Sequence, residues 1–330
     1  AGALGALFVG LTGFIVVPLR EMGVMTIPEF YEKRFSRGVR VLGGVILFTA
    51  GVLNMGMFLK AGGQFVTAMT GLEENLLKIV MTVLLALVLL YTILGGMVSV
   101  VITDYLQFVV LSFGMLLASA LAFHEVGWTN IVNTVESVHG NAGFDLFVSE
   151  GFGVEYVLWM ILAAIIGSGL WPVATMRACS AQNTQVVKRL YSWSSVGFLI
   201  RSLIPIFLGI CAVAFFFRHE SAASQLFLDG KLVGDSNTQM QLMPLFLSQI
   251  LPAGLIGLIG AGMLAAFMST HDSYLLCWSS VLVQDIIAPC FPGELSTKTR
   301  LLLARLVILL IGIYLLVFGL WYDLGGQALM

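Results

Sequence analysis

Long apolar segments follow one another along almost the whole chain, separated by short polar stretches. A helix needs about 20 apolar residues to cross the roughly 30 Å of hydrocarbon in a bilayer, and most of these segments reach that length. The pattern therefore predicts an all-α integral membrane protein with about eight transmembrane helices in a single domain over residues 1–330. The expected spans are residues 1–18, 41–70, 76–98, 103–123, 154–176, 193–217, 252–287 and 302–321.

Composition supports this fold class and narrows the chemistry. Hydrophobic residues make up 59% of the chain and charged residues 10%, and the mean hydropathy of +0.99 lies outside the range of soluble domains. The net charge of −2, without a run of Lys and Arg, gives no indication of nucleic-acid binding. Nucleophiles, bases and metal ligands converge in no motif, so we expect neither an enzyme nor a bound cofactor.

Basic residues indicate which ends of the spans face the cytoplasm. They gather after the first span, after the fifth and before the eighth, whereas residues 124–153 contain none. Because cytoplasmic loops retain Lys and Arg, we expect these three clusters on the cytoplasmic side. The chain starts inside an apolar stretch without a basic leader, and we expect it to be an internal piece of a longer membrane protein. The clusters contain Arg20, Lys33, Arg34, Arg37, Arg40, Arg177, Lys188, Arg189, Lys298, Arg300 and Arg305.

Small and hydroxylated residues interrupt the seventh apolar segment. At helical spacing, Ala266, Ser269, Thr270 and Ser273 fall on one face. Hydroxyl oxygens together with a backbone carbonyl can form the neutral oxygen cage that suits a bare cation such as sodium. The alternative is structural, because Ser and Thr also donate to the carbonyl four residues earlier and allow close helix packing. The residues alone favour the structural alternative.

A glycine pair and an acidic residue lie between the third and fourth spans. Gly95 and Gly96 predict a tight turn or a close helix contact. Asp104 lies just inside the next apolar segment, near the cytoplasmic side. Its carboxylate serves either as a waypoint for a cation or as an interfacial cap of the new helix, and the residues alone leave both interpretations open.

Residues 26–35, TIPEFYEKRF, predict a short surface helix. Thr26 can cap it, Pro28 suits its first turn, and Glu29 lies at the capping-box position. These features predict local structure and indicate no function by themselves.

Three motifs together resemble the sodium/solute symporter family, the relatives of the sodium–glucose and sodium–proline cotransporters. They are TIPEFYEKRF at 26–35, YTILGGMVSVVITDYLQ at 91–107 and AAFMSTHDS at 265–273, and they occur in the family's order and spacing. MRACSAQNTQVVKR at 176–189 is a looser version of a cytoplasmic loop of the family. The resemblance implies a LeuT-like core of two five-helix inverted repeats, in which the expected spans are the second to ninth helices and the first and last are missing.

The resemblance also implies roles for individual residues. The sodium site of the family would draw the Ala266 carbonyl and the Ser269 and Thr270 hydroxyls from this chain, with further carbonyls from the missing first helix. Asp104 matches a carboxylate thought to assist sodium on its way to the cytoplasm. Asp272 points away from the hydroxyl face at helical pitch, so we expect it to make a structural polar contact.

Four residues are candidates for a substrate pocket. Lys60 and Arg201 are cations within expected spans, and each meets either an anionic substrate or a partner within the protein. Ser168 and Trp171 lie in a Gly- and Pro-containing segment that can interrupt its helix and free backbone groups for a polar ligand, although Trp171 also suits packing. The polar sugar-binding set of the family is mostly absent, so a hexose is not favoured.

The expected function is sodium-coupled secondary active transport. Inward sodium flow would drive uptake of a small organic solute by alternating access, in a multi-pass protein of the plasma membrane (the inner membrane of a bacterial cell). The expected partners are Na⁺, the solute and the lipid bilayer. Two alternatives remain: a proton-coupled transporter of the same fold, which a pH-dependent and sodium-independent response would select, and a transporter-like membrane sensor.

Overall fold

The structure is a computed structural model that describes residues 1–147, 153–218, 227–228, 231–232, 236–291, 293 and 295–321. Its regular secondary structure within these residues is helical except for one antiparallel pair of two-residue strands, Phe227–Leu228 (β1) and Lys231–Leu232 (β2). The α-helices are α1 (Gly2–Thr12), α2 (Val16–Glu21), α3 (Ile27–Arg34), α4 (Arg37–Thr70), α5 (Glu74–Val126), α6 (Trp128–His139), α7 (Gly153–Leu170), α8 (Pro172–Ser180), α9 (Thr184–Arg218), α10 (Ser236–Ile250), α11 (Ala253–Val281), α12 (Ala288–Cys290) and α13 (Thr297–Trp321). A 3₁₀ turn, η1 (Gly140–Gly143), follows α6, and a π-helical segment, η3 (Leu282–Ile287), continues α11.

Six of the described helices are long and apolar enough to cross a membrane, where the sequence predicts about eight spans. The all-α membrane fold is confirmed, and the difference in number has two local causes. First, the third and the fourth expected span are both present, as two helices that meet at a kink at Gly96 (φ 58°, ψ −152°), where the glycine pair predicts a turn; together they form the 53-residue element α5 and are counted once. Second, the helix of the first span ends after 11 residues, because Gly13 adopts the left-handed conformation and Ile15 also has a positive φ of 64°.

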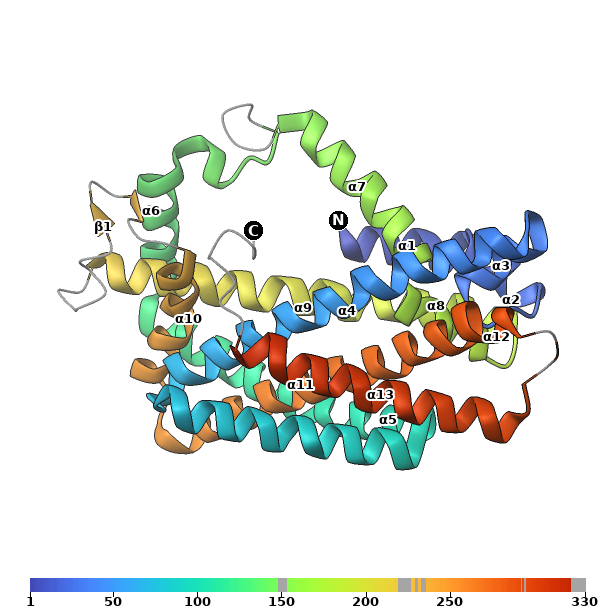
Figure 1. Cartoon of the computed structure of the whole chain (residues 1–330). Coiled ribbons are helices and arrows are strands. Elements are labelled where there is room, and N and C mark those ends of the chain that lie inside the picture. Colours follow the sequence, from blue (N-terminus) through green and yellow to red (C-terminus); the bar gives the residue numbers. More distant parts are fainter. Residues whose placement is uncertain are drawn as a thin grey trace.

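Most of the long helices run lengthwise between two ends of the molecule, and α7 runs obliquely to them (Figure 1). The short helices α2, α3, α8 and α12 gather at one end, and α6, α10 and β1 lie at the other. The first end contains the basic clusters that the sequence assigns to the cytoplasm, among them Arg20 on α2, Arg34 on α3 and Arg177 on α8. We therefore call it the cytoplasmic end.

Helix α11 lies at the centre of the larger packing cluster, in contact with α4, α5, α8 and α13. From His271 onward most of its side chains are buried, and Trp278 is only 2% exposed. Helix α1 packs against α7 and α9, and α9 in turn contacts α5, α6 and α10. Two of the helices that contact α11 are therefore α5, which contains the predicted ion-route residue Asp104, and α8.

Helix α3 confirms the predicted capping pattern. Thr26 Oγ1 accepts a hydrogen bond from the Glu29 amide at 3.3 Å, and the Glu29 carboxylate accepts one from the Met25 amide at 2.8 Å. Pro28 occupies the first turn, where its missing N–H leaves no helical bond unmade. Local sequence therefore accounts for the start of this helix at the cytoplasmic end.

The break between α7 and α8 is also where the sequence predicts one. α7 ends at Leu170, Trp171 has an extended conformation (φ −65°, ψ 115°), and Pro172 begins α8. A residue before proline is disfavoured in the helical region, which explains why the helix stops here. The result is a short, separate helix α8 at the cytoplasmic end.

Candidate functional site

The predicted sodium-binding residues lie on one partly buried face of α11. Thr270 Oγ1 donates a hydrogen bond to the Ala266 carbonyl at 2.9 Å, which is the contact expected from the structural alternative. The same contact places a hydroxyl and a carbonyl oxygen side by side, with Ser269 next to Thr270 in the helix. A hydroxyl that donates one hydrogen bond keeps lone pairs that can bind a cation. The arrangement is therefore compatible with both interpretations, and sodium binding at these residues stays a prediction.

Three helices meet one turn further along the same face. Arg177 of α8 places its Nη2 2.7 Å from Asp104 Oδ2 of α5 and 2.5 Å from Ser273 Oγ of α11. The ion pair is partly exposed, with 39% of the Arg177 side chain and 17% of the Asp104 side chain accessible. Asp104 lies inside α5 beyond the break at Gly96, so its interpretation as a helix cap is wrong. Its role on a cation route stays a prediction.

A second carboxylate, Asp272, adjoins this contact and is fully buried. Tyr91 of α5 donates its hydroxyl proton to Asp272 Oδ2 at 2.6 Å, and Ser273 Oγ donates to Asp272 Oδ1 at 3.2 Å. Hydrogen bonds thus run continuously from Arg177 through Ser273 and Asp272 to Tyr91. The predicted structural role of Asp272 agrees with these contacts.

Arg177 is the functional-site residue that the sequence interpretation missed. The sequence assigns it only to the cytoplasmic basic residues and to the loop motif at 176–189, because no local pattern pairs it with Asp104, 73 positions away along the chain. A usable signal did exist: an acidic residue inside an apolar segment needs a partner, and Arg177 follows directly on a predicted span end.

The substrate-pocket candidates whose side chains the structure describes lie on α7, on α9 and at the break between α7 and α8. Trp171 is 44% exposed and meets Tyr274 of α11 edge to face, with ring centroids 6.0 Å apart. Arg201 is exposed on α9, with its guanidinium carbon 5.0 Å from the centre of the Phe198 ring on the same helix. Ser168 is partly buried near the end of α7. Lys60 belongs to α4, but its side chain lies outside what the structure describes.

A further polar cluster closes the cytoplasmic end of α11. Asp285 of η3 is fully buried and accepts hydrogen bonds from Thr26 Oγ1 at 2.8 Å and from Arg40 Nε at 2.9 Å. Arg40 also pairs with Glu32, so α3, α4 and η3 are joined through one guanidinium group. The sequence interpretation did not single out Asp285, because no local motif marks it.

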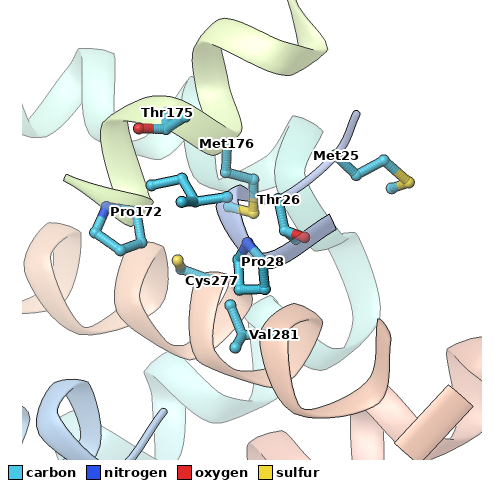
Figure 2. Close-up of a pocket in the computed structure, with 9 residues that line it drawn as sticks. Met25, Thr26, Pro28, Pro172, Thr175, Met176, Cys277 and Val281 are labelled. Atoms are coloured by element: carbon cyan, nitrogen blue, oxygen red, sulfur yellow. The ribbon is translucent and has the colours of Figure 1, made fainter. Parts of the chain in front are cut away.

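A small cavity lies beside this cluster, between the start of α3, α8 and α11 (Figure 2). Its walls are mostly apolar, with the Thr26 and Thr175 hydroxyls as exceptions, and they have no charged side chain. Such a lining suits the packing of α8 more than the binding of a polar solute. The lining residues are Met25, Thr26, Ile27, Pro28, Pro172, Thr175, Met176, Cys277 and Val281.

Cys179 of α8 leads to a prediction about this part of the molecule. Burial raises the pKa of its thiol to about 11. Because only the thiolate is alkylated, the rate of modification should keep rising by roughly tenfold per pH unit beyond pH 9, up to about pH 11. Mass spectrometry of iodoacetamide-treated protein measures this rate at each pH. The measurement uses a Cys290→Ser background, because Cys290 is exposed and would also react. A rate that levels off near pH 9 would show that the thiol is not buried as described.

Comparisons with known proteins agree with the motifs. The sequence model of the sodium:solute symporter family matches residues 2–324. Sodium/glucose cotransporter 1 of sheep (Ovis aries) is 28% identical over 345 residues, covering 93% of this chain and 50% of the relative. The high-affinity proline transporter PutP of Bacillus subtilis is 26% identical over 301 residues, covering 89% of this chain and 59% of the relative. The chain thus spans about half the length of the curated relatives it matches.

A solved structure shows the same fold. It is a Na⁺-coupled sialic acid symporter in a substrate-bound, outward-open state, and it superposes with a TM-score of 0.73 at 20% sequence identity. The match covers 97% of this chain and 66% of that one, and it confirms the predicted LeuT-like membrane fold. With a family match over nearly its whole length, the chain belongs to the sodium:solute symporter family, whose members are multi-pass membrane transporters.

Proposed function

We propose that the protein is a sodium-coupled symporter of the plasma membrane that imports a small organic solute by alternating access. The observation that supports this most is one face of α11. It presents the Ala266 carbonyl and the Ser269 and Thr270 hydroxyls one turn from Ser273, where Asp104 meets Arg177. In a member of this family, such a row of oxygens between the middle of a helix and the cytoplasmic end fits a sodium site with its exit route.

Sodium is the coupling ion in this proposal, and no other cofactor takes part. Neutral oxygens bind a hard cation well when the cation has no strict requirement for its coordination geometry. Burying the cation is favourable only if protein oxygens replace most of its water shell. The three oxygens of α11 supply part of that shell. The remaining ligands would come from other backbone carbonyls around the site.

The substrate proposal is restricted to a class. Relatives of this chain carry the names of glucose and proline transporters, which share small size and several hydrogen-bonding groups. Trp171 and Ser168 adjoin the break between α7 and α8, where aromatic surface and a hydroxyl lie close together. We assign these two residues to the pocket, with Lys60 and Arg201 as candidates for contact with a carboxylate if the solute is an anion.

Proton coupling is the second candidate, and His271 is the observation that favours it. Its ring is 1% exposed next to Thr270, Nδ1 lies 2.8 Å from the Phe267 carbonyl oxygen, and Nε2 is buried as well. A buried imidazole beside an ion route can take up and release a proton.

Uptake by the full-length protein in proteoliposomes tests the proposal. Vesicles are given an inward gradient of sodium, of protons or of neither, at equal ionic strength, with radiolabelled sugars, amino acids and small carboxylates outside. Concentrative uptake of at least one solute should require the sodium gradient. Uptake driven by the proton gradient in sodium-free buffer would reject sodium coupling and select the His271 alternative.

A further inference from the structure

Arg177 lies on a short, separate helix of the site. The short helix α8 follows the break at Trp171, and its far end is held by Arg20 of α2, which donates to the Ala181 carbonyl at 2.6 Å and to the Gln182 carbonyl at 3.2 Å. A short helix between a broken backbone and a loop can shift as a unit, since few helical hydrogen bonds must change. Any such shift moves the Arg177 guanidinium relative to α5 and α11.

The guanidinium lies among oxygens that a departing cation would use. Ser273 is four residues after Ser269, so its hydroxyl lies about 6 Å further along the same face of α11. Nη2 of Arg177 contacts this hydroxyl and Asp104 Oδ2 together. A positive charge of the protein therefore occupies the place where the next ligands on the route would bind a sodium ion.

The geometry of the contact between Arg177, Asp104 and Ser273 allows it to open. Nη2 alone makes both hydrogen bonds, and the pair is not the two-pronged arrangement that makes Arg–carboxylate contacts strong. The second carboxylate oxygen, Asp104 Oδ1, is buried and has no hydrogen-bond partner among the described residues. Because the Arg177 side chain is 39% exposed, water can replace its contacts when it leaves.

We propose that Arg177 is a tethered cation that closes the cytoplasmic exit of the sodium route. While it binds Asp104 and Ser273, it competes with sodium for both residues. When α8 moves, Asp104 is released and accepts the ion on its way to the cytoplasm. This inference rests on the proposed function and adds a gating residue to it.

The test is a sodium titration of the full-length protein in detergent, read from thermal unfolding at constant ionic strength. Arg177→Gln should lower the apparent sodium dissociation constant roughly two- to fivefold, the range expected from removing a half-exposed ion pair that competes with the ion. Arg189→Gln is the matched control: it removes the same charge from an exposed position of the same cytoplasmic region and should leave the constant unchanged.

Two further variants separate gating from a merely structural role. In an Asp104→Asn background, Arg177→Gln should have a smaller effect on sodium binding, because only its competition for Ser273 remains. In Arg177→Ala, millimolar guanidinium chloride should restore the wild-type constant, whereas choline chloride should not. If Arg177→Gln is too unstable to measure, Arg177→Lys keeps the charge but loses the planar guanidinium that contacts Asp104 and Ser273 together, and it should lower the constant by a smaller factor.

The outcomes distinguish the two proposals. If sodium does not change the unfolding temperature of the wild-type protein, both the proposed function and this inference are rejected. A wild type that responds to sodium, with Arg177→Gln indistinguishable from Arg189→Gln, rejects the gate alone. Weaker sodium binding in Arg177→Gln would also reject the gate, since it would make Arg177 a support of the site rather than a competitor.

Discussion

Replacing Ser269 and Thr270 by alanine together should abolish sodium-driven uptake. Two of the three oxygens that the proposed sodium site takes from α11 disappear, and a sodium ion left with an incomplete shell does not recover its hydration energy. The Ala266 carbonyl alone cannot replace them. Initial uptake rates in proteoliposomes with an inward sodium gradient measure the effect, and the double variant should fall to the rate of protein-free vesicles.

The control is Thr270→Ser, which keeps the hydroxyl oxygen and removes only a methyl group. It should retain most of the sodium-driven rate. Both variants must have the same unfolding temperature in choline chloride as the wild type, which excludes loss of fold as the cause. Sodium-driven uptake by Ser269→Ala/Thr270→Ala would show that these hydroxyls serve only the helix, as Thr270 does when it donates to Ala266.

The second large effect concerns stability and involves Gly51→Ala. A Cβ atom at Gly51 of α4 would lie 2.1 Å from Cε2 and 2.2 Å from Cζ2 of Trp278, far inside van der Waals contact. Trp278 is buried at 2% exposure, so its ring has no free space to move into and the helices must separate. Overpacking of this kind costs about 1–3 kcal/mol or more, and we expect a clear fall in unfolding temperature.

Gly43→Ala in the same helix provides the matched comparison. There the nearest side-chain atoms to an added Cβ lie at 4.0 Å, on Pro28 and Tyr31. The substitution should be neutral or slightly stabilising, because alanine favours a helix over glycine by about 1 kcal/mol. Equal unfolding temperatures for the two variants would contradict the close crossing of α4 and α11.

Features that depend on neighbouring residues in the chain could be predicted from the sequence. Hydrophobic runs of sufficient length located the spans, and the fold class, the turn at Gly96 and the start of α3 at Thr26 were all confirmed. The third and fourth expected spans are both present, as the two helices that meet at Gly96 within α5, whereas the helix of the first span ends early at Gly13. Hydropathy reports where apolar residues lie and not where the backbone breaks.

Features that depend on distant residues could not be predicted in this way. The partner of Asp104 is Arg177 on another helix, and Asp285 gathers Thr26 and Arg40 from far along the chain. The first pairing follows from how α5 and α8 pack, and the second from how α3, α4 and η3 pack. No local motif specifies either arrangement. The residues of the α11 face were found because a helix with a repeat of 3.6 residues brings them together within one short segment.

Thermal stability of the purified full-length protein in detergent tests the central claim most directly. It is measured in sodium, potassium and choline chloride at equal ionic strength. A ligand that binds only the folded state stabilises it by about 2.7 kcal/mol at a hundredfold excess over its dissociation constant. We expect a rise in unfolding temperature in sodium alone, which disappears in Ser269→Ala/Thr270→Ala. Equal stability of the wild type in all three salts would contradict sodium binding at α11.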